Sequence, residues 1–145
     1  MESISKSAVV PFTAEQMYDL VNDVETYPLF LPWCSAGVVH THEPHYMKAS
    51  VSLAVGAVKQ TFTTENSLKP AERIDVQLVS GPFKKLHGYW TFEPAGEGMC
   101  RISFKMNFEY KNMLVKLALN KIFQGIGNSM VSCFIERAKQ LYAER

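Results

Sequence analysis

The chain has 145 residues, of which 47% are hydrophobic and 20% are charged, and its formal net charge is +1 at pH 7. A disordered chain would be less hydrophobic, and a protein that binds nucleic acid over its whole surface would be far more basic. The composition therefore excludes both classes, DNA binding included. A domain of this length buries about 70% of its unfolded surface, so we expect residues 1–145 to form one domain with its own core.

The charge is distributed unevenly along the chain. Residues 1–110 carry 9 Lys and Arg against 12 Asp and Glu, a balance of −3, whereas residues 111–145 carry 6 against 2, a balance of +4. An ordinary solvated helix face explains this excess, and so does a basic surface that meets the phosphates of lipid or RNA. The sequence leaves both interpretations open.

The cysteines and the N-terminus indicate a compartment. Cys34, Cys100 and Cys133 are an odd number without C-x-x-C spacing, which argues against a disulfide framework and for a reducing environment. The first residues have neither the basic nor the apolar region of a signal peptide. The longest uncharged stretch near the C-terminus, residues 122–135, is too short to span a bilayer. We expect a soluble, cytoplasmic protein that can also lie at the periphery of the inner membrane.

The N-terminal part predicts one strand followed by two short helices. Residues 3–10 read as the strand. Thr13 and Gln16 have the spacing of a capping box, in which each side chain binds a backbone N–H of the other residue. The helix that follows should bury Met17, Leu20 and Val21. A second helical piece is predicted over residues 24–31, and it ends at Pro32.

From residue 36 onward, apolar side chains recur at every second position. Strict alternation gives one buried and one wet face, which is typical of an antiparallel sheet. Turn signals at residues 69–70, 80–82 and 93–96 separate the runs, and we expect about seven strands in total. The apolar positions of the clearest runs are Val51, Leu53, Ile74, Val76, Leu78, Leu86, Trp90, Phe92, Ile102, Phe104, Met106, Phe108 and Tyr110.

After Lys111 the pattern becomes helical, and Asn112 is a good residue to cap the helix. The helix is expected to reach about residue 142, a length on the order of 45 Å. Gly125 and Gly127 lie in its middle, where each costs about 1 kcal/mol relative to Ala. Such a cost suggests a kink or a close backbone approach, and it suits a helix that shifts to admit a ligand. The apolar stripe of the helix comprises Val115, Leu119, Ile122, Ile126, Met130 and Phe134.

The order of these elements predicts the fold class. One strand, two short helices, six more strands and a long helix indicate an α+β helix-grip fold, in which a curved antiparallel sheet of about seven strands surrounds the C-terminal helix. Folds of this kind commonly enclose a pocket between helix and sheet.

The sequence offers little for catalysis or metal binding. It contains no Gly-rich phosphate loop, no G-x-S-x-G turn and no H-E-x-x-H motif. His40 and His42 share one face of a strand and His45 follows in the turn, but no thiol or carboxylate is placed to complete a zinc site. Gln60 and Thr64 read as positioning groups and not as acids or bases. We therefore expect no metal, no required cofactor and no enzymatic activity.

Large apolar residues are abundant in two loop segments, residues 27–34 and 81–86. A lid that plugs the open end of the fold explains them as well as a ligand gate does. A large apolar pocket with few polar groups is the usual design of a lipid or cofactor site.

Three ordered segments carry a resemblance that covers nearly the whole chain. Residues 21–34 contain V-N-D-V, Y-P, F-L-P and a cysteine; residues 81–92 read G-P-F-K-x-L-x-G-x-W-x-F; residues 101–112 read R-I-x-F-x-M-x-F-E-Y-x-N. Together they resemble the START-like coenzyme Q-binding proteins of the polyketide cyclase/lipid transport group, which have a START/Bet v 1-like helix-grip fold. The match is strongest to short bacterial members, some of which are described as a ribosome association toxin that binds the large subunit.

The resemblance implies that the chain binds ubiquinone, or a related isoprenoid quinone or lipid, as a carrier or chaperone that supports respiration without turning the quinone over. A polyisoprenoid tail favours a dry tunnel, because each buried CH₂ contributes about 0.8 kcal/mol. Inhibition of ribosome association through the large subunit is the alternative, and cyclase or aromatase chemistry is a third. The candidate ligand-binding residues are Phe30, Leu31, Trp33, Phe62, Phe83, Leu86, Trp90, Phe104, Met106, Leu119, Ile122, Phe123, Ile126 and Met130.

Overall fold

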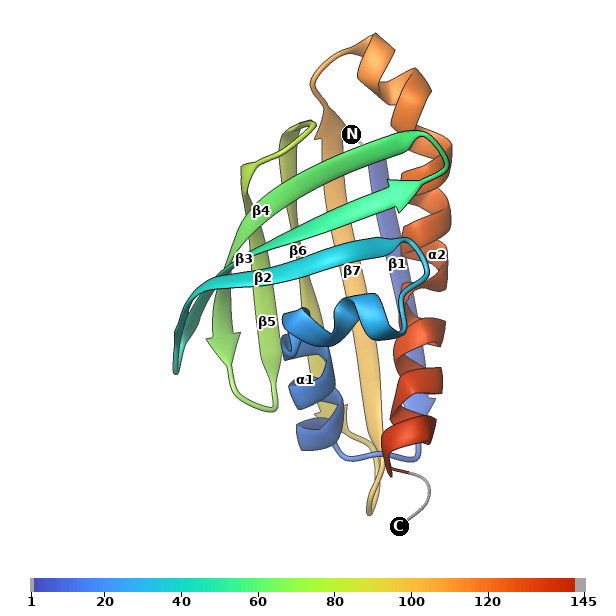
Figure 1. The fold of residues 1–145 in the computed structure, drawn as a ribbon. Helices are drawn as coiled ribbons and strands as arrows, with labels where there is room; N and C mark the ends of the chain where they lie inside the picture. The colour runs from blue at the N-terminus through green and yellow to red at the C-terminus, as the bar shows by residue number, and fades with distance from the viewer. Residues whose placement is uncertain (1, 143–145) are drawn as a thin grey trace.

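All strands of the described part of the chain join one antiparallel sheet (Figure 1). The computed structural model describes residues 2–142. Across the sheet the order is β1-β7-β6-β5-β4-β3-β2, so successive strands from β2 to β7 are neighbours and the first strand pairs with the last. The predicted number of seven strands is confirmed. The strand bounds are Glu2–Val10 for β1, Cys34–Glu43 for β2, Tyr46–Val55 for β3, Val58–Lys69 for β4, Arg73–Ser80 for β5, Phe83–Pro94 for β6 and Cys100–Tyr110 for β7.

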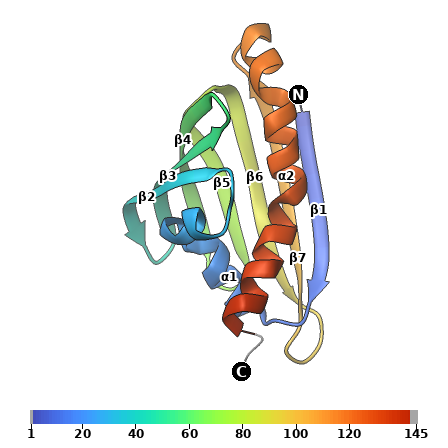
Figure 2. The same cartoon turned by 45° about the vertical axis from the view of Figure 1, so that its right-hand side comes forward.

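The sheet curves around the long helix α2 (Met113–Tyr142). Strands β2, β3 and β4 run in a clearly different direction from β1, β6 and β7, and α2 lies along the open side of the curve (Figures 1 and 2). Irregularities in register help the sheet to bend, because an extra residue increases the local twist. They occur between Cys34 and Ala36 and between Val39 and Thr41 in β2, between Leu78 and Ser80 in β5 opposite Thr63 and Thr64, and between Phe83 and Lys85 in β6.

The alternation read from the sequence is confirmed in the central strands. Leu86, Trp90 and Phe92 of β6 are at most 5% exposed, and they face the same side as the buried residues of β7. Trp90 pairs with Phe104 in the register, and their ring centroids lie 4.5 Å apart. The apolar side chains of adjacent strands therefore meet on the concave face, where the core lies.

The helix α1 (Ala14–Asn22) begins with the predicted capping box. The Thr13 hydroxyl accepts from the Gln16 backbone N–H at 3.1 Å, and the Gln16 side chain accepts from the Thr13 N–H at 2.9 Å. The second helical piece is shorter than predicted: η1 is a 3-10 helix over Val24–Leu29 and does not reach residue 31. Pro28 lies in the last turn of η1. Beyond Leu29 the chain leaves the helix and leads into β2, which begins at Cys34.

The helix α2 begins where the sequence predicts. The Asn112 side chain accepts from the Val115 backbone N–H at 3.0 Å and so caps the helix. The buried stripe differs in part from the predicted one, since Val115, Ile122 and Met130 are only half-buried. The fully buried positions of α2 are Leu119, Phe123, Ile126, Gly127, Val131, Phe134 and Ala138.

The two glycines of α2 behave differently. A Cβ built on Gly127 would overlap the Ile4 side chain of β1, so the predicted close backbone approach is confirmed there. A Cβ built on Gly125 would meet nothing within 4 Å, so the same prediction is wrong for that position. Gly127 faces the sheet, whereas Gly125 lies on the exposed face of the helix.

The three cysteines are free, and Cys34 and Cys100 are buried. None of the helices within residues 2–142 combines the length and the apolar character needed to cross a bilayer.

Candidate functional site

An apolar cavity lies between α2 and the concave face of the sheet. It has two adjoining chambers, of about 60 Å³ and about 90 Å³, whose walls share Trp33, Phe62 and Met130 among other residues. The smaller one, here called the helix chamber, lies against Ile126 and Gly127 of α2. The larger one, here called the loop chamber, lies against the end of α1 and against η1.

Nine of the fourteen predicted ligand-binding residues line this cavity. They are Trp33, Phe62, Leu86, Trp90, Phe104, Met106, Phe123, Ile126 and Met130. They come from β4, β6, β7, α2 and the segment before β2, so the fold brings together positions that are far apart in the sequence.

The other five predicted residues lie elsewhere. Phe30 packs against Phe134 of α2, with ring centroids 5.3 Å apart, and lines neither chamber. Leu31 is 1% exposed and Leu119 is 6% exposed, and both are core residues. Ile122 is half-buried, and Phe83 belongs to the ring cluster described below. None of these five side chains lines either chamber.

Sequence reasoning missed much of the polar part of the wall. Asn22, Tyr27 and Asn66 line the loop chamber, but none was a candidate residue. The alternation in β4 places Thr64 and Asn66 on the same inward face as Phe62, and this signal could have found Asn66. Asn22 is the last residue of α1, and only the packing of α1 on the sheet brings it to the chamber.

Two residues that line the loop chamber carry buried polar atoms without a partner in the described part of the chain. The Trp33 side chain is 7% exposed, and neither its Nε1–H nor the buried Oδ1 of Asn22 has a hydrogen-bond partner among the described residues. The Thr64 hydroxyl donates to Asn66 Oδ1 at 2.9 Å, which leaves the amide N–H groups of Asn66 as donors. A buried polar group without a partner costs about 1–3 kcal/mol, so a bound molecule that pairs with these atoms would recover that cost.

The tyrosine hydroxyl beside this chamber, that of Tyr27, is already satisfied. Tyr27 donates to the carbonyl of Val21, and burial, with smaller effects of Cys34 and Asp23, raises the pKa of Tyr27 well above its usual value. Tyr27 therefore stays neutral and holds η1 against the end of α1.

Five aromatic rings form a cluster between the helix chamber and the surface. This ring cluster consists of Phe62, Phe83, Phe108, Tyr110 and Phe123. Phe123 lines the helix chamber, and its ring centroid lies 4.9 Å from that of Phe83, which lines a groove on the outer surface. The contact between these two rings thus joins the wall of the helix chamber to the outer groove.

Tyr110 ties the cluster to the helix. Its hydroxyl donates to the side-chain oxygen of Asn120 in α2 at 3.1 Å. Burial, and secondly the charge of Glu2, raises the pKa of Tyr110 to about 12. The phenol is neutral at physiological pH and acts as a hydrogen-bond donor.

The described residues contain no group of three or more His, Cys, Asp and Glu side chains that could hold a metal ion. His40 forms a hydrogen bond of 2.7 Å with Ser50, and the ring of His45 lies 3.2 Å from the Leu68 carbonyl oxygen, on the outside of the sheet. Of the two positioning groups expected from the sequence, Thr64 lines both chambers, while Gln60 is half-buried on the same strand.

The basic side chains of the last segment are spread over several environments. Lys116 lies 3.2 Å from Glu2 and Lys139 lies 3.3 Å from Glu136, so both form ion pairs. The Arg137 guanidinium lies 5.4 Å from the ring centroid of Phe30. Arg145 lies outside the described residues. The positive charge of this segment is therefore not a continuous stripe along the outer face of α2.

Comparison with known proteins places the chain in a family. A family model described as polyketide cyclase / dehydrase and lipid transport matches residues 10–135. The ribosome association toxin RatA of Escherichia coli (strain K12) is 44% identical over 145 residues, which cover all of this chain and 92% of that protein. The mitochondrial coenzyme Q-binding protein COQ10 homolog B of Xenopus laevis is 29% identical over 145 aligned residues, 97% of this chain and 59% of that protein.

The fold recurs in solved structures. The Zhui aromatase/cyclase from Streptomyces sp. R1128 superposes with a TM-score of 0.86 over 99% of this chain and 97% of that chain, at 13% identity. At this level of identity the likeness concerns the fold alone, and it confirms the predicted α+β helix-grip class.

Proposed function

The chain belongs to the polyketide cyclase / dehydrase and lipid transport family, and we propose that it binds an isoprenoid quinone, ubiquinone or a close relative, in the cavity between α2 and the sheet. The observation that carries the proposal is the combination of an apolar wall with two residues at one end, Trp33 and Asn22, whose Nε1–H and Oδ1 have no hydrogen-bond partner among the described residues. The printed name of the Xenopus relative, a coenzyme Q-binding protein, supports the same class of ligand.

The cavity must widen to hold such a ligand. Chambers of about 60 Å³ and about 90 Å³ are well below the volume of about 300–1,000 Å³ that encloses a drug-sized molecule. Met106 and Met130 line both chambers, and methionine side chains change conformation at little cost. The exposed face of α2 at Gly125 also has no packed neighbour that would oppose a shift of the helix.

The two ends of the ligand would find different environments. The loop chamber offers the Trp33 N–H and the Asn66 amide as donors to a quinone carbonyl, and Asn22 Oδ1 as an acceptor for the hydroxyl of the reduced form. Apart from Thr64 and the Trp33 that it shares with the loop chamber, the helix chamber is lined by Gly127 and apolar side chains, which suits the isoprenoid tail. Each tail CH₂ that becomes buried contributes about 0.8 kcal/mol.

Binding without turnover fits the chemistry of the wall. The polar groups that line the two chambers are amides, two indoles, a hydroxyl and a phenol whose pKa is raised, and none of these is an acid or base near neutral pH. The four histidines lie at exposed positions. We therefore propose a carrier or chaperone role in respiration, and not the cyclase or aromatase chemistry known by name from structural neighbours.

Two measurements test the proposal. Organic extraction of natively purified protein followed by mass spectrometry should recover a quinone. Titration of the emptied protein with decylubiquinone should quench its tryptophan fluorescence, because the chain has two tryptophans and both, Trp33 and Trp90, line the loop chamber. An empty extract together with an absence of saturable quenching would rule the proposal out.

A second candidate function rests on a different observation. Relatives of 44–45% identity that align with 96–100% of the chain carry the name ribosome association toxin. The surface lysines Lys85, Lys111 and Lys121 form no ion pair within the described residues, and they could contact rRNA phosphates. The two roles use different parts of the molecule, since the cavity is internal and the lysines are external.

Co-sedimentation with purified large ribosomal subunits tests this second role. Binding through phosphates should weaken steeply between low and moderate salt, because each neutralised phosphate releases counterions. If the protein stays in the supernatant at low salt, the ribosome role does not apply to this chain.

A further inference from the structure

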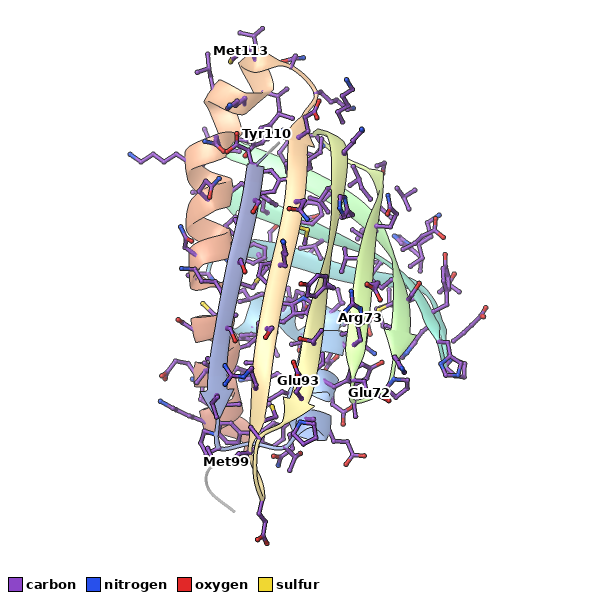
Figure 3. The ribbon with its side chains drawn as sticks, turned by 180° about the vertical axis from the view of Figure 1, so that it is seen from behind. Glu72, Arg73, Glu93, Met99, Tyr110 and Met113 are labelled. Atoms are coloured by element: carbon purple, nitrogen blue, oxygen red, sulfur yellow. The ribbon has the colours of Figure 1, made fainter. Side chains whose placement is uncertain are left out.

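The first two turns of α2 expose large aliphatic side chains. Met113, Leu114 and Leu117 retain 65%, 79% and 74% of their accessible surface, and they are the first, second and fifth residues of the helix. Figures 1 and 2 show that this end of α2 projects beyond the ends of the strands, and Figure 3 shows Met113 farther out than Tyr110 at the end of β7. These three residues are here called the helix tip.

The helix tip is not explained by the fold. Side chains that follow at steps of three and four lie on one face of a helix, and Leu114, Leu117 and the exposed Lys121 form such a row. This row faces away from the buried stripe of α2, so the start of the helix is apolar on both sides. A contiguous exposed apolar patch of this kind marks a contact with another molecule or with a membrane.

Lysines surround the helix tip. Met113 lines a surface groove together with Lys84, Lys111 and Lys116, and the adjoining groove includes Lys85. With Lys121, five lysines stand against two carboxylates, Glu2 and Glu109, which gives a balance of +3. Glu109 and Glu2 pair with Lys84 at 3.7 Å and with Lys116 at 3.2 Å, while Lys85, Lys111 and Lys121 form no ion pair among the described residues.

We infer that the helix tip docks on an anionic lipid surface, with Met113, Leu114 and Leu117 inserted among the acyl chains and the lysines against the lipid phosphates. Aliphatic side chains on one helix face with lysines beside them are typical of helices that lie in a membrane interface. Lysine side chains reach back to the phosphates while their methylene groups stay in the apolar layer.

The position of the helix tip links this surface to the cavity. Tyr110 and Lys111 lie beside it in the same groove, and Tyr110 belongs to the ring cluster. Two rings in contact, Phe83 at the outer groove and Phe123 at the helix chamber, connect the two sides of the cluster. Docking would therefore place the ring cluster, which borders both the groove and the cavity, at the lipid surface, which suits the exchange of an apolar ligand. This step rests on the proposed function, whereas the docking itself does not.

The chemistry of the helix tip favours lipid over RNA. Proteins that bind RNA recognise unstacked bases with aromatic rings or arginine planes. The helix tip instead presents one methionine and two leucine side chains. Such apolar side chains gain free energy when they leave water for an apolar phase.

Flotation with vesicles tests the inference. Vesicles of phosphatidylglycerol and phosphatidylcholine should bind the full chain, and pure phosphatidylcholine vesicles should bind it more weakly. The double variant Leu114→Gln/Leu117→Gln should bind the anionic vesicles at least about tenfold more weakly, because two inserted side chains are lost without a change in charge. Each of Lys84→Gln, Lys111→Gln and Lys121→Gln should weaken binding by up to about fivefold.

Leu29→Gln is the matched control, because Leu29 is 70% exposed but lies in η1, away from the helix tip. This variant should bind vesicles as the unmodified chain does. The double variant should still quench with decylubiquinone in vesicle-free solution, which separates this inference from the proposed function.

Three results would overturn the inference. The unmodified chain could fail to bind anionic vesicles, or the double variant could bind them undiminished. The double variant could also keep vesicle binding and lose only co-sedimentation with the large ribosomal subunit, which would assign the helix tip to the ribosome. If the unmodified chain binds vesicles but no quinone, docking stands and the proposed ligand is wrong.

Discussion

Gly127 of α2 and Ile4 of β1 touch so closely that a Cβ built on the glycine would overlap Ile4 Cδ1 and lie 3.1 Å from Ile4 Cγ2. Ile4 is 4% exposed, and both residues line the helix chamber. This contact sets the distance between the helix and the first strand, so it also sets the width of the cavity at that point.

Gly127→Ala should destabilise the protein. The added methyl group must displace the packed Ile4 side chain, which costs about 1–3 kcal/mol in a close-packed core. The gain in helix propensity offsets about 1 kcal/mol of this. We expect a net loss of about 1 kcal/mol in the free energy of unfolding, measured with urea; a variant that is more stable than the original would contradict the close contact.

Gly125→Ala is the matched change at an open position. The new Cβ would meet nothing within 4 Å, so only the helix propensity changes. We expect the free energy of unfolding to rise by up to about 1 kcal/mol. Ligand uptake should fall at the same time if a shift of α2 at this glycine admits the ligand, and unchanged uptake would show that the shift occurs elsewhere.

Trp33→Phe removes a buried N–H that has no partner among the described residues. Because that donor is unsatisfied in the empty protein, its removal costs no hydrogen bond, and the loss of stability should be limited to that caused by the smaller buried side chain. Affinity for decylubiquinone, followed through the remaining Trp90, should fall by about tenfold, the worth of one hydrogen bond in a buried site. Equal affinity in both proteins would mean that Trp33 does not bind the quinone head group.

Tyr27→Phe provides the comparison for Trp33→Phe. The Tyr27 hydroxyl donates to the Val21 carbonyl, so its removal leaves a buried acceptor without its partner. We expect a loss of about 1–2 kcal/mol in the free energy of unfolding. A variant as stable as the original would mean that the bond contributes nothing to holding η1 in place.

Ala49→Leu fills the loop chamber from β3. Ala49 is 2% exposed and lines the chamber of about 90 Å³, so the larger side chain occupies space that the ligand would need. The folded protein should lose quinone quenching while the secondary structure seen by circular dichroism is retained. Val51→Leu adds only a single methylene group in the same chamber. It serves as the second test in case Ala49→Leu overpacks the core. Two folded variants that both bind quinone as before would exclude this chamber.

The free energy of unfolding should fall as the pH rises from 10 to about 12. Burial, and secondly Glu2, raises the pKa of Tyr110 from 10.0 to about 12 in the folded protein. The unfolded chain therefore loses this proton first, so the stability that the neutral phenol provides is complete below pH 10 and decreases above it. Tyr110→Phe should reduce this pH dependence in urea unfolding at pH 9 and pH 11. An identical pH dependence in both proteins would argue against the raised pKa.

Much of the architecture could be predicted because its causes are local. The capping box at Thr13 depends on side chains three residues apart, and the Asn112 cap depends on the backbone of the next turn. The alternation over residues 102–110 assigns inward and outward faces without reference to any partner strand. Length and turn chemistry then leave few arrangements other than a curved antiparallel sheet around the last helix.

The cavity could be predicted only in part. Apolar residues at alternating strand positions point to the concave face, and five of the nine candidates that reach the cavity wall, Phe62, Leu86, Trp90, Phe104 and Met106, do so for that reason. Phe83 and Phe104 have the same sequence signal, yet one belongs to the ring cluster and the other lines both chambers. Their different roles depend on where each lies along the curved sheet relative to α2, and no local pattern carries that information.

By itself the sequence determined the strands, the caps, the long helix and the apolar inner face, because hydrogen bonding and periodicity act over a few residues. Only the tertiary structure decided that Gly127 and not Gly125 meets the sheet and that the helix tip at Met113 projects beyond the strands. It also decided that Trp33 Nε1 and Asn22 Oδ1 are buried without a hydrogen-bond partner among residues 2–142. These features arise from the packing of segments that are distant in the chain, where the space between side chains is set by all of them together.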